Sequence, residues 1–172
     1  VRHTPILRRF NMAATAWQLY NSAKKYIGQG TSTITLGAGV FKMALFTSDS
    51  NASTFTLSAY GGGGALTSVT NEIATAGGYV AGGKNLVPAT GQWTVNPSSA
   101  KQMKFTMSTV GLAFTASGAN LENIKFAVIR NSTGAAAGKL LCWCKLSSSQ
   151  FDVTSPNTLT VLPAATGIFT LT

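Results

Sequence analysis

The feature that most constrains the fold is an alternation of apolar and polar residues that recurs along the chain after Gly30. In the segment 40–47, Phe41, Met43 and Leu45 are separated by single residues, so a strand would place all three on one face. The same pattern recurs at 93–95, 103–107, 110–115, 124–129, 140–146, 159–161 and 168–171. Strands with one apolar face are typical of antiparallel sheets that bury one side.

These runs predict a mainly β fold, an antiparallel β-sandwich that is jelly-roll-like or immunoglobulin-like, with one short N-terminal helix. Clusters of turn-forming residues such as 131–134 and 155–157 separate the strands. We find no second helical period after Gly30, which argues against alternating strands and helices. The length of 172 residues is typical of one domain. We therefore divide the chain into a basic N-terminal arm, 1–12, and a single β-sandwich domain, 13–172.

One segment near the N-terminus has helical periodicity. Ala16, Tyr20, Ala23 and Ile27 recur at spacings of four, three and four, which forms one apolar stripe on a helix. The order of residues 15–18, a threonine followed three positions later by a glutamine, fits a capping box. Two glycines, at 28 and 30, would end the element. The spacing predicts a helix over 13–27.

Several segments read as turns or loops. We expect a short strand at 33–36 followed by a turn at 37–39. The segment 48–71 is rich in Ser, Thr, Ala and Gly, so we expect a long loop with at most one short strand at 54–57. A loop of this length in a compact domain is usually functional or held by a partner. The glycine pairs at 77–78 and 82–83 indicate bulges or close backbone approach.

The chain offers little material for catalysis. Charged residues make up 10% of it, and the carboxylates are Asp49, Glu72, Glu122 and Asp152. The single histidine, His3, lies in the arm, so a Ser or Cys nucleophile would lack its usual base. We interpret the acidic residues as turn-forming or ion-paired groups, and a glycosidase built on two of them is the minor alternative. The sequence therefore predicts no enzyme, no catalytic residue, no cofactor and no small-molecule substrate.

Cysteine, metal and membrane chemistry are also disfavoured. Cys142 and Cys144 lie two positions apart, so on a strand their side chains point the same way, which is poor geometry for a disulfide. We interpret both as reduced, buried side chains and predict no metal site, since one Cys-x-Cys pair supplies too few ligands. The glycines at 61–64 and 82–83 lack the context of a phosphate-binding loop. No apolar run reaches the ~18 residues of a membrane span.

The net charge of +9 indicates an acidic partner. Nucleic acid is one candidate, because a basic domain attracts phosphates. The cations are dispersed, however, and most aromatic residues fall on the apolar faces of the predicted strands. Nucleic-acid binding is therefore a secondary interpretation, and an acidic protein shell is the other.

Four blocks of the sequence resemble a widespread family of small tailed-phage virion proteins. They are the segment 16–28, the FKMALFT strand at 41–47, the NEIATAGGYVAGGKNL segment at 71–86 and the GIFTL ending at 167–171. The resemblance implies a structural protein of the virion, with a role as a capsid decoration or cement protein on the head surface. It implies the major capsid protein as partner, homo-oligomers, and localisation in the virion and, during assembly, in the host cytoplasm. A head–tail connector or tail protein is the alternative.

Partner contacts are expected in two places. The arm has no internal apolar period, and the loop 48–71 has little of its own to bury, so both would gain order on a partner. The candidate contact residues are Arg2, Ile6, Leu7, Arg8, Arg9 and Phe10 in the arm, and Phe55 and Tyr60 in the loop. The arginines would pair with acidic groups and the apolar residues would anchor. The alternative is that the arm folds back over its own domain.

Overall fold

A computed structural model describes residues 14–28, 34–60, 68–87, 92–95, 102–134 and 137–171. Within these ranges the chain is mainly β, with one helix. The elements are β1 (Gln18–Leu19), α1 (Asn21–Gly28), β2 (Phe41–Thr47), β3 (Ala59–Tyr60), β4 (Ser68–Val69), β5 (Lys84–Asn85), β6 (Trp93–Val95), β7 (Met103–Phe105), β8 (Leu112–Thr115), β9 (Leu121–Asn131), β10 (Leu140–Lys145), β11 (Phe151–Val153), β12 (Thr158–Val161) and β13 (Phe169–Leu171).

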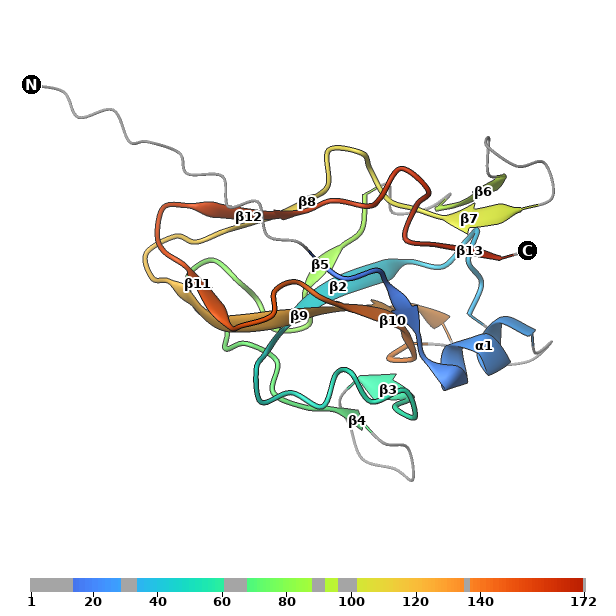
Figure 1. The fold of residues 1–172 in the computed structure, drawn as a ribbon, viewed down its shortest axis with the longest axis horizontal. Coiled ribbons are helices and arrows are strands. Elements are labelled where there is room, and N and C mark those ends of the chain that lie inside the picture. Colours follow the sequence, from blue (N-terminus) through green and yellow to red (C-terminus); the bar gives the residue numbers. More distant parts are fainter. Residues whose placement is uncertain are drawn as a thin grey trace, which may run out of the picture.

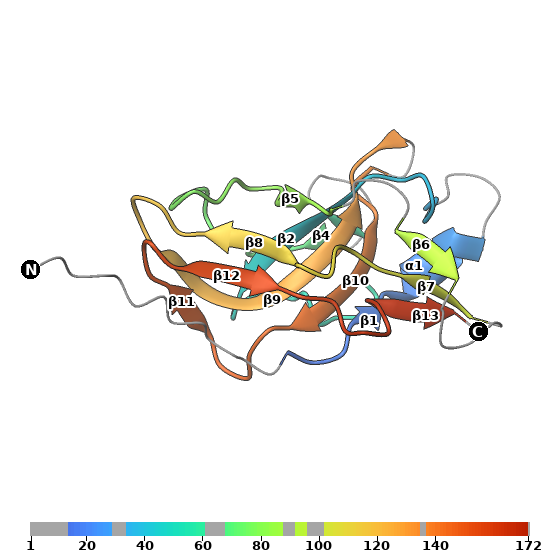
Figure 2. The same cartoon turned by 90° about the horizontal axis from the view of Figure 1, so that it is seen from above.

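A six-stranded antiparallel sheet is the centre of the molecule. Its order is β1-β10-β9-β2-β5, and β11 also pairs with β9. Two smaller antiparallel sheets, β12-β8 and β13-β7-β6, lie on one side of it, while α1 and the short parallel pair β3-β4 lie on the other (Figure 1). Figure 2, the view from above, shows β8 and β12 crossing over β9. The predicted mainly β, sandwich-like fold with one helix is therefore confirmed, and the parallel pair is an addition to it.

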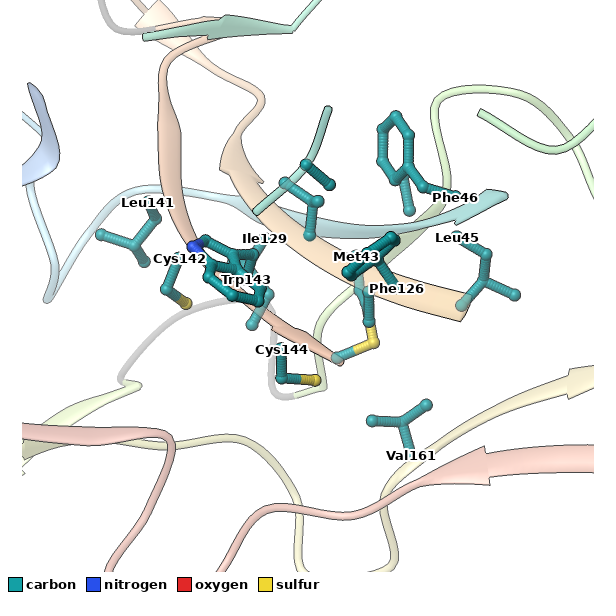
Figure 3. Packing of buried hydrophobic residues seen from close by; sticks show 14 of the residues in the cluster. Met43, Leu45, Phe46, Phe126, Ile129, Leu141, Cys142, Trp143, Cys144 and Val161 are labelled. Carbon is teal, nitrogen blue, oxygen red and sulfur yellow. The ribbon is translucent and has the colours of Figure 1, made fainter. Parts of the chain in front are cut away.

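The core between the two sheet layers is built from the predicted apolar face. Met43 of β2 and Cys142 of β10 both lie opposite Ile129 of β9, so the three side chains share one face. Figure 3 shows Met43 and Cys144 directed towards Val161 of β12.

Aromatic rings complete the same core in the part nearer β7. The Phe41 ring meets the Phe105 ring edge-on at 4.9 Å between centroids, and Phe105 stacks on Phe169 at 5.3 Å. Edge-on and stacked contacts of this kind suit the charge distribution of aromatic rings. The central sheet and the β13-β7-β6 sheet are therefore joined by three rings in sequence.

The opposite face of the central sheet is also buried. Ala44, Phe46, Val128 and Trp143, which point away from the first core, are between fully and nine-tenths buried. This is why the segment 140–144 is apolar at every position and does not alternate. A single apolar face was the sequence-based expectation, and the central strands depart from it because a second layer covers them.

The segment 48–60 supplies much of this second cover. Ala52 and Leu57 are fully buried, and the Tyr20 hydroxyl donates to the Ala52 carbonyl at 2.7 Å. The Phe55 ring meets the Trp143 ring at 5.8 Å. The expectation that this loop has little of its own to bury is therefore wrong, because its few apolar side chains are spaced to reach the sheet.

The helix is shorter than the predicted 13–27, since among the described residues it begins at Asn21. Thr15 does not cap a helix. Its N–H donates to the Lys145 carbonyl at 2.8 Å, and its hydroxyl accepts the Lys145 N–H at 3.0 Å. Residues 18–19 then pair with β10 as β1. The exposed edge of β10 needs hydrogen-bond partners, and this tertiary pairing outweighs the local helical propensity.

Two other short strands were predicted wrongly. The segment 54–57 forms turns, in which the Leu57 N–H donates to the Thr54 carbonyl at 3.2 Å. Leu36 lies in a turn held by the Gly39 N–H, which donates to the Thr35 carbonyl at 2.7 Å. Both segments are too short for alternation to distinguish a strand from a turn whose apolar side chain points inward.

The two cysteines are reduced and fully buried, as the sequence predicted. Burial raises the pKa of the Cys144 thiol to about 12 and raises the pKa of Cys142 well above its usual range, because a thiolate cannot be solvated there. An unfolded thiol titrates near pH ~8.5. The folded state therefore keeps protons that the unfolded state releases, and stability is full below pH ~8.5 and falls as the pH rises.

We expect the free energy of unfolding to fall between pH ~8.5 and ~10, by about 2 kcal/mol for Cys144 alone. Urea titrations at a series of pH values measure it. Cys144→Ala should reduce this dependence to the part that Cys142 contributes, even if it lowers stability overall. A slope that stays unchanged in Cys144→Ala would contradict the assignment, since the buried tyrosines, which also contribute near pH ~10, are the same in both proteins.

Candidate functional site

The segment 71–85, which carries the NE…GGYxxGG pattern, is bound to β2 at both ends. Near its start, the Thr47 N–H donates to the Asn71 carbonyl and the Ile73 N–H to the Leu45 carbonyl, both at 3.0 Å. Near its end, β5 pairs antiparallel with β2. The intervening residues therefore form a closed loop along this strand.

The carboxylate of Glu72, near the start of this loop, is the acceptor that several parts of the chain share. It accepts hydrogen bonds from the hydroxyls of Tyr60 and Tyr79 and, at 2.8 Å, from the Gly82 N–H. The Tyr79 hydroxyl in turn accepts the Leu45 N–H at 3.1 Å. Both carboxylate oxygens thus have donors, and the two phenols connect the loop, β3 and the central sheet.

Arg130 of β9 completes the group. Its guanidinium lies over the Tyr60 ring at 4.0 Å from the centroid, and its Nη2 donates to the Gly82 carbonyl at 3.0 Å. A cation over an aromatic ring is worth about 0.5–2 kcal/mol, more when it is shielded from water. We call Tyr60, Glu72, Tyr79, Gly82 and Arg130 the Glu72 cluster.

The protonation states in the Glu72 cluster suit a structural role. Burial raises the pKa of Tyr60 and of Tyr79, and their hydrogen bonds to Glu72 raise it further. The phenols therefore stay protonated and act as donors to the carboxylate. A general base must accept a proton from a substrate, whereas the Glu72 oxygens already accept three bonds from the chain itself. The arrangement binds one loop firmly to the sheet.

Glycine is required where this loop passes close to the backbone of β2 and of the segment between β8 and β9. Gly83 has a φ of 73°, and a Cβ at this position would lie 2.0 Å from the Met43 carbonyl oxygen. Gly77 has a φ of 57°, and its Cβ would lie 2.5 Å from the Ala119 carbonyl oxygen. The predicted close backbone approach at the glycine pairs is confirmed at both positions.

The predicted contact residues fall into two groups. Phe55 is 44% exposed with one side of its ring against Trp143, and Tyr60 is partly buried in the Glu72 cluster. The arm residues Arg2, Ile6, Leu7, Arg8, Arg9 and Phe10 lie outside the described residues. Binding of a partner by any of them stays a prediction, and Tyr60 already has a role within its own chain.

The other carboxylates do not converge on a site. Asp152 accepts the Asn123 N–H at 2.7 Å, and Asp49 lies in a turn after β2. Glu122 borders a hollow of about 230 Å³ whose walls include Thr47 and Asn120. Among the described residues, no group of three or more His, Cys, Asp and Glu side chains could hold a metal ion.

Sequence reasoning did not identify the Glu72 cluster. It treated Glu72 as a candidate for an ion pair, whereas the partners are two phenols and a backbone N–H. Tyr60, Tyr79 and Arg130 come from segments far apart in the chain, so no local pattern links them. The order of Asn-Glu followed by Gly-Gly-Tyr in one block was the available signal.

Comparisons of the chain with protein-family models, with curated proteins and with solved structures found no match. In the part of the chain that the structure describes, no helix has the length and apolar character needed to cross a membrane.

We expect Glu72→Gln to lower the free energy of unfolding by about 2 kcal/mol, because the amide loses charge-assisted bonds and brings its own donors towards two phenols. Urea denaturation followed by tryptophan fluorescence measures the change. Glu122→Gln, at an exposed carboxylate, is the matched control and should stay within about 0.5 kcal/mol. Equal stability of both variants would contradict a structural role for Glu72.

We also expect Gly83→Ala to lower stability by at least about 2 kcal/mol more than Gly118→Ala. Gly118 has nearly the same φ, 75°, but its Cβ would meet no atom within 4 Å. The difference in thermal or urea stability between the two variants isolates the clash with Met43 from the backbone strain that they share. A difference close to zero would show that β2 and the loop separate easily.

Proposed function

We propose that the protein is a non-enzymatic structural protein of a tailed-phage virion, a capsid decoration or cement protein that binds the head surface and stabilises the shell. The observation that carries this proposal is the ordered set of sequence blocks that resemble small virion proteins. Two of these blocks, 41–47 and 71–86, lie against each other through β2, β5 and the Glu72 cluster. Two blocks that carry the resemblance therefore also contact each other in the fold.

Surface contacts of the kind that a decoration protein uses are available. Val110 is 77% exposed and Leu162 is 57% exposed. They lie near each other, because a Cβ at Gly111 would fall 2.8 Å from a Leu162 methyl carbon. Exposed apolar groups that lie together favour a protein–protein contact.

Charge supports an acidic partner. The net charge is +9, and the Glu72 carboxylate is engaged within its own chain. A positive protein is steered towards negative surfaces. The proposed partners are the major capsid protein and further copies of this chain, in the virion and, during assembly, in the host cytoplasm.

Two alternatives have some support. A head–tail connector or tail protein would share the structural character and the resemblance. A nucleic-acid-binding module is favoured by the net charge and by two cations that lie over tyrosine rings, Arg130 over Tyr60 and Lys139 over Tyr26.

Sedimentation distinguishes these functions. The purified full-length protein is mixed with DNA-free heads, with isolated tails or with duplex DNA from the same phage. We expect it to pellet with the heads, saturably, and to raise the temperature at which the heads open. Pelleting with tails alone would assign it to the tail, and binding to DNA but not to empty heads would overturn the proposal.

A further inference from the structure

We propose that the outer edge of β12, Thr158–Val161, pairs with the same edge of a second copy of this chain, so that two copies join through an antiparallel pair of strands. The inference goes beyond the proposed function, which includes copies of the chain among its partners but assigns them no surface. It concerns the chain by itself and holds wherever the protein acts.

The register of β12 with β8 determines which backbone groups face outward. Thr158 lies opposite Thr115 of β8, and at the neighbouring pair the Ala116 N–H donates to the Asn157 carbonyl at 2.9 Å. Opposed residues of an antiparallel pair are hydrogen-bonded at alternate positions. The N–H and C=O groups of Thr158 and Thr160 therefore point away from β8. Within the described ranges, no backbone group pairs with them.

The opposite edge of this two-stranded sheet is closed. The Lys84 ammonium donates to the outward-facing Ala113 carbonyl of β8 at 2.8 Å. A Cβ at Gly78 would lie 3.0 Å from the Thr115 carbonyl oxygen, so the loop 71–85 approaches this edge at a second point. Figure 2 shows β8 between β12 and β5. Because only the β12 edge is open, pairing through it closes after two copies and does not continue into a fibre.

The segments that form this sheet carry no charged side chain. Neither 105–121, which includes β8, nor 153–172, which includes β12, contains Asp, Glu, Lys, Arg or His. The net charge of +9 repels a second copy elsewhere, whereas two uncharged edges can approach each other. An acidic protein or a phosphate backbone would find no cation in these segments. The charge distribution therefore favours a second copy as the occupant of this edge.

The β12 edge is also complementary to itself. With a two-fold axis at Leu159, Thr158 of one copy lies opposite Thr160 of the other, and each of the two such pairs can exchange two backbone hydrogen bonds. The threonine side chains are exposed, and β-branched residues paired across strands favour strand association. Pro156 and Pro163 lack an N–H and flank the segment, so they limit the pairing to a few residues.

Exposed apolar side chains extend this surface beyond the end of β12. Leu162 follows β12 directly, and Val110 lies near it. Val87, also exposed, belongs to the same area, because its carbonyl accepts the N–H of Ser108, two positions before Val110. In the two-fold pair, Leu162 of one copy lies opposite Pro156 of the other. Removal of these apolar groups from water adds to the few backbone hydrogen bonds.

Sedimentation velocity of the purified full-length protein, over a series of concentrations, tests the proposal. We expect a reversible monomer–dimer equilibrium that Thr160→Pro weakens at least about tenfold, because two of the four backbone hydrogen bonds are lost. An edge strand tolerates proline where the N–H faces outward. Ala113→Pro is the matched control, since it removes the outward N–H of the residue opposite Thr160 on the closed edge. It should leave the dissociation constant within about twofold of the wild type.

Hydrogen exchange of the wild-type amides at 158 and 160 gives a second readout that does not depend on variants. We expect both amides to exchange rapidly in dilute protein and slowly in concentrated protein. A wild type that stays monomeric at millimolar concentration, or equal effects of the two proline variants, would overturn the proposal. Protection of both amides in the dilute monomer would do the same, because the chain itself would then cover the edge.

Protection that arises only when phage heads are added would also overturn the proposal, in favour of a capsid protein as the occupant. Pelleting with heads is a separate measurement that does not require dimers. Failure of the strand pairing is therefore distinguishable from failure of the proposed function.

Discussion

Burial of both faces of the strands β2, β9 and β10 is the constraint on which the rest of the structure depends. A sheet buried on one side needs one cover, and here the β12-β8 and β13-β7-β6 sheets supply it. The apolar residues on the other face, among them Phe46 and Trp143, would otherwise meet water. Full burial of such a side chain is worth about 1.5–3 kcal/mol, so a second cover is strongly favoured. The segment 48–60 and α1 provide it without forming a regular sheet.

An irregular cover needs polar anchors, because few backbone bonds hold it in register. The Glu72 cluster is the main anchor, since it links β3, the loop 71–85 and β9 through one carboxylate and one guanidinium. The bond from Tyr20 to the Ala52 carbonyl performs a similar role nearer α1. Buried polar networks hold a structure best when their members are satisfied. The partly buried Glu72 carboxylate has three donors, whereas the buried Nε of Arg130 has no hydrogen-bond partner among the described residues. The cluster therefore anchors the cover mainly through its carboxylate.

The period-two interpretation of the sequence predicted the long strands β2, β9 and β10 and the mainly β class, because such patterns indicate a buried face. In β10 the strand was found although both of its faces are apolar. It could not predict β1, β3, β4 and β5, which are two residues long and exist only because a neighbouring strand offers backbone partners. The helix was over-extended for the same reason, since Thr15 satisfies the edge of β10. The Glu72 cluster could not be predicted from the sequence, because Tyr60, Tyr79 and Arg130 are brought together only by the folded topology.

Two of the four blocks that carry the sequence resemblance, 16–28 and 71–86, contain residues that form the second cover or hold it in place. Tyr79 and Gly83 pack against the rest of the chain, so replacing either would disturb the packing at β2 and would not directly alter an exposed contact surface. In the proposed function, recognition would depend on side chains that the fold leaves outside, such as Lys24, Lys25, Val110 and Leu162. These positions are not constrained by packing, so they can change with the partner while the fold stays the same. A chain of this kind would keep its inward-facing blocks and vary its contact surface.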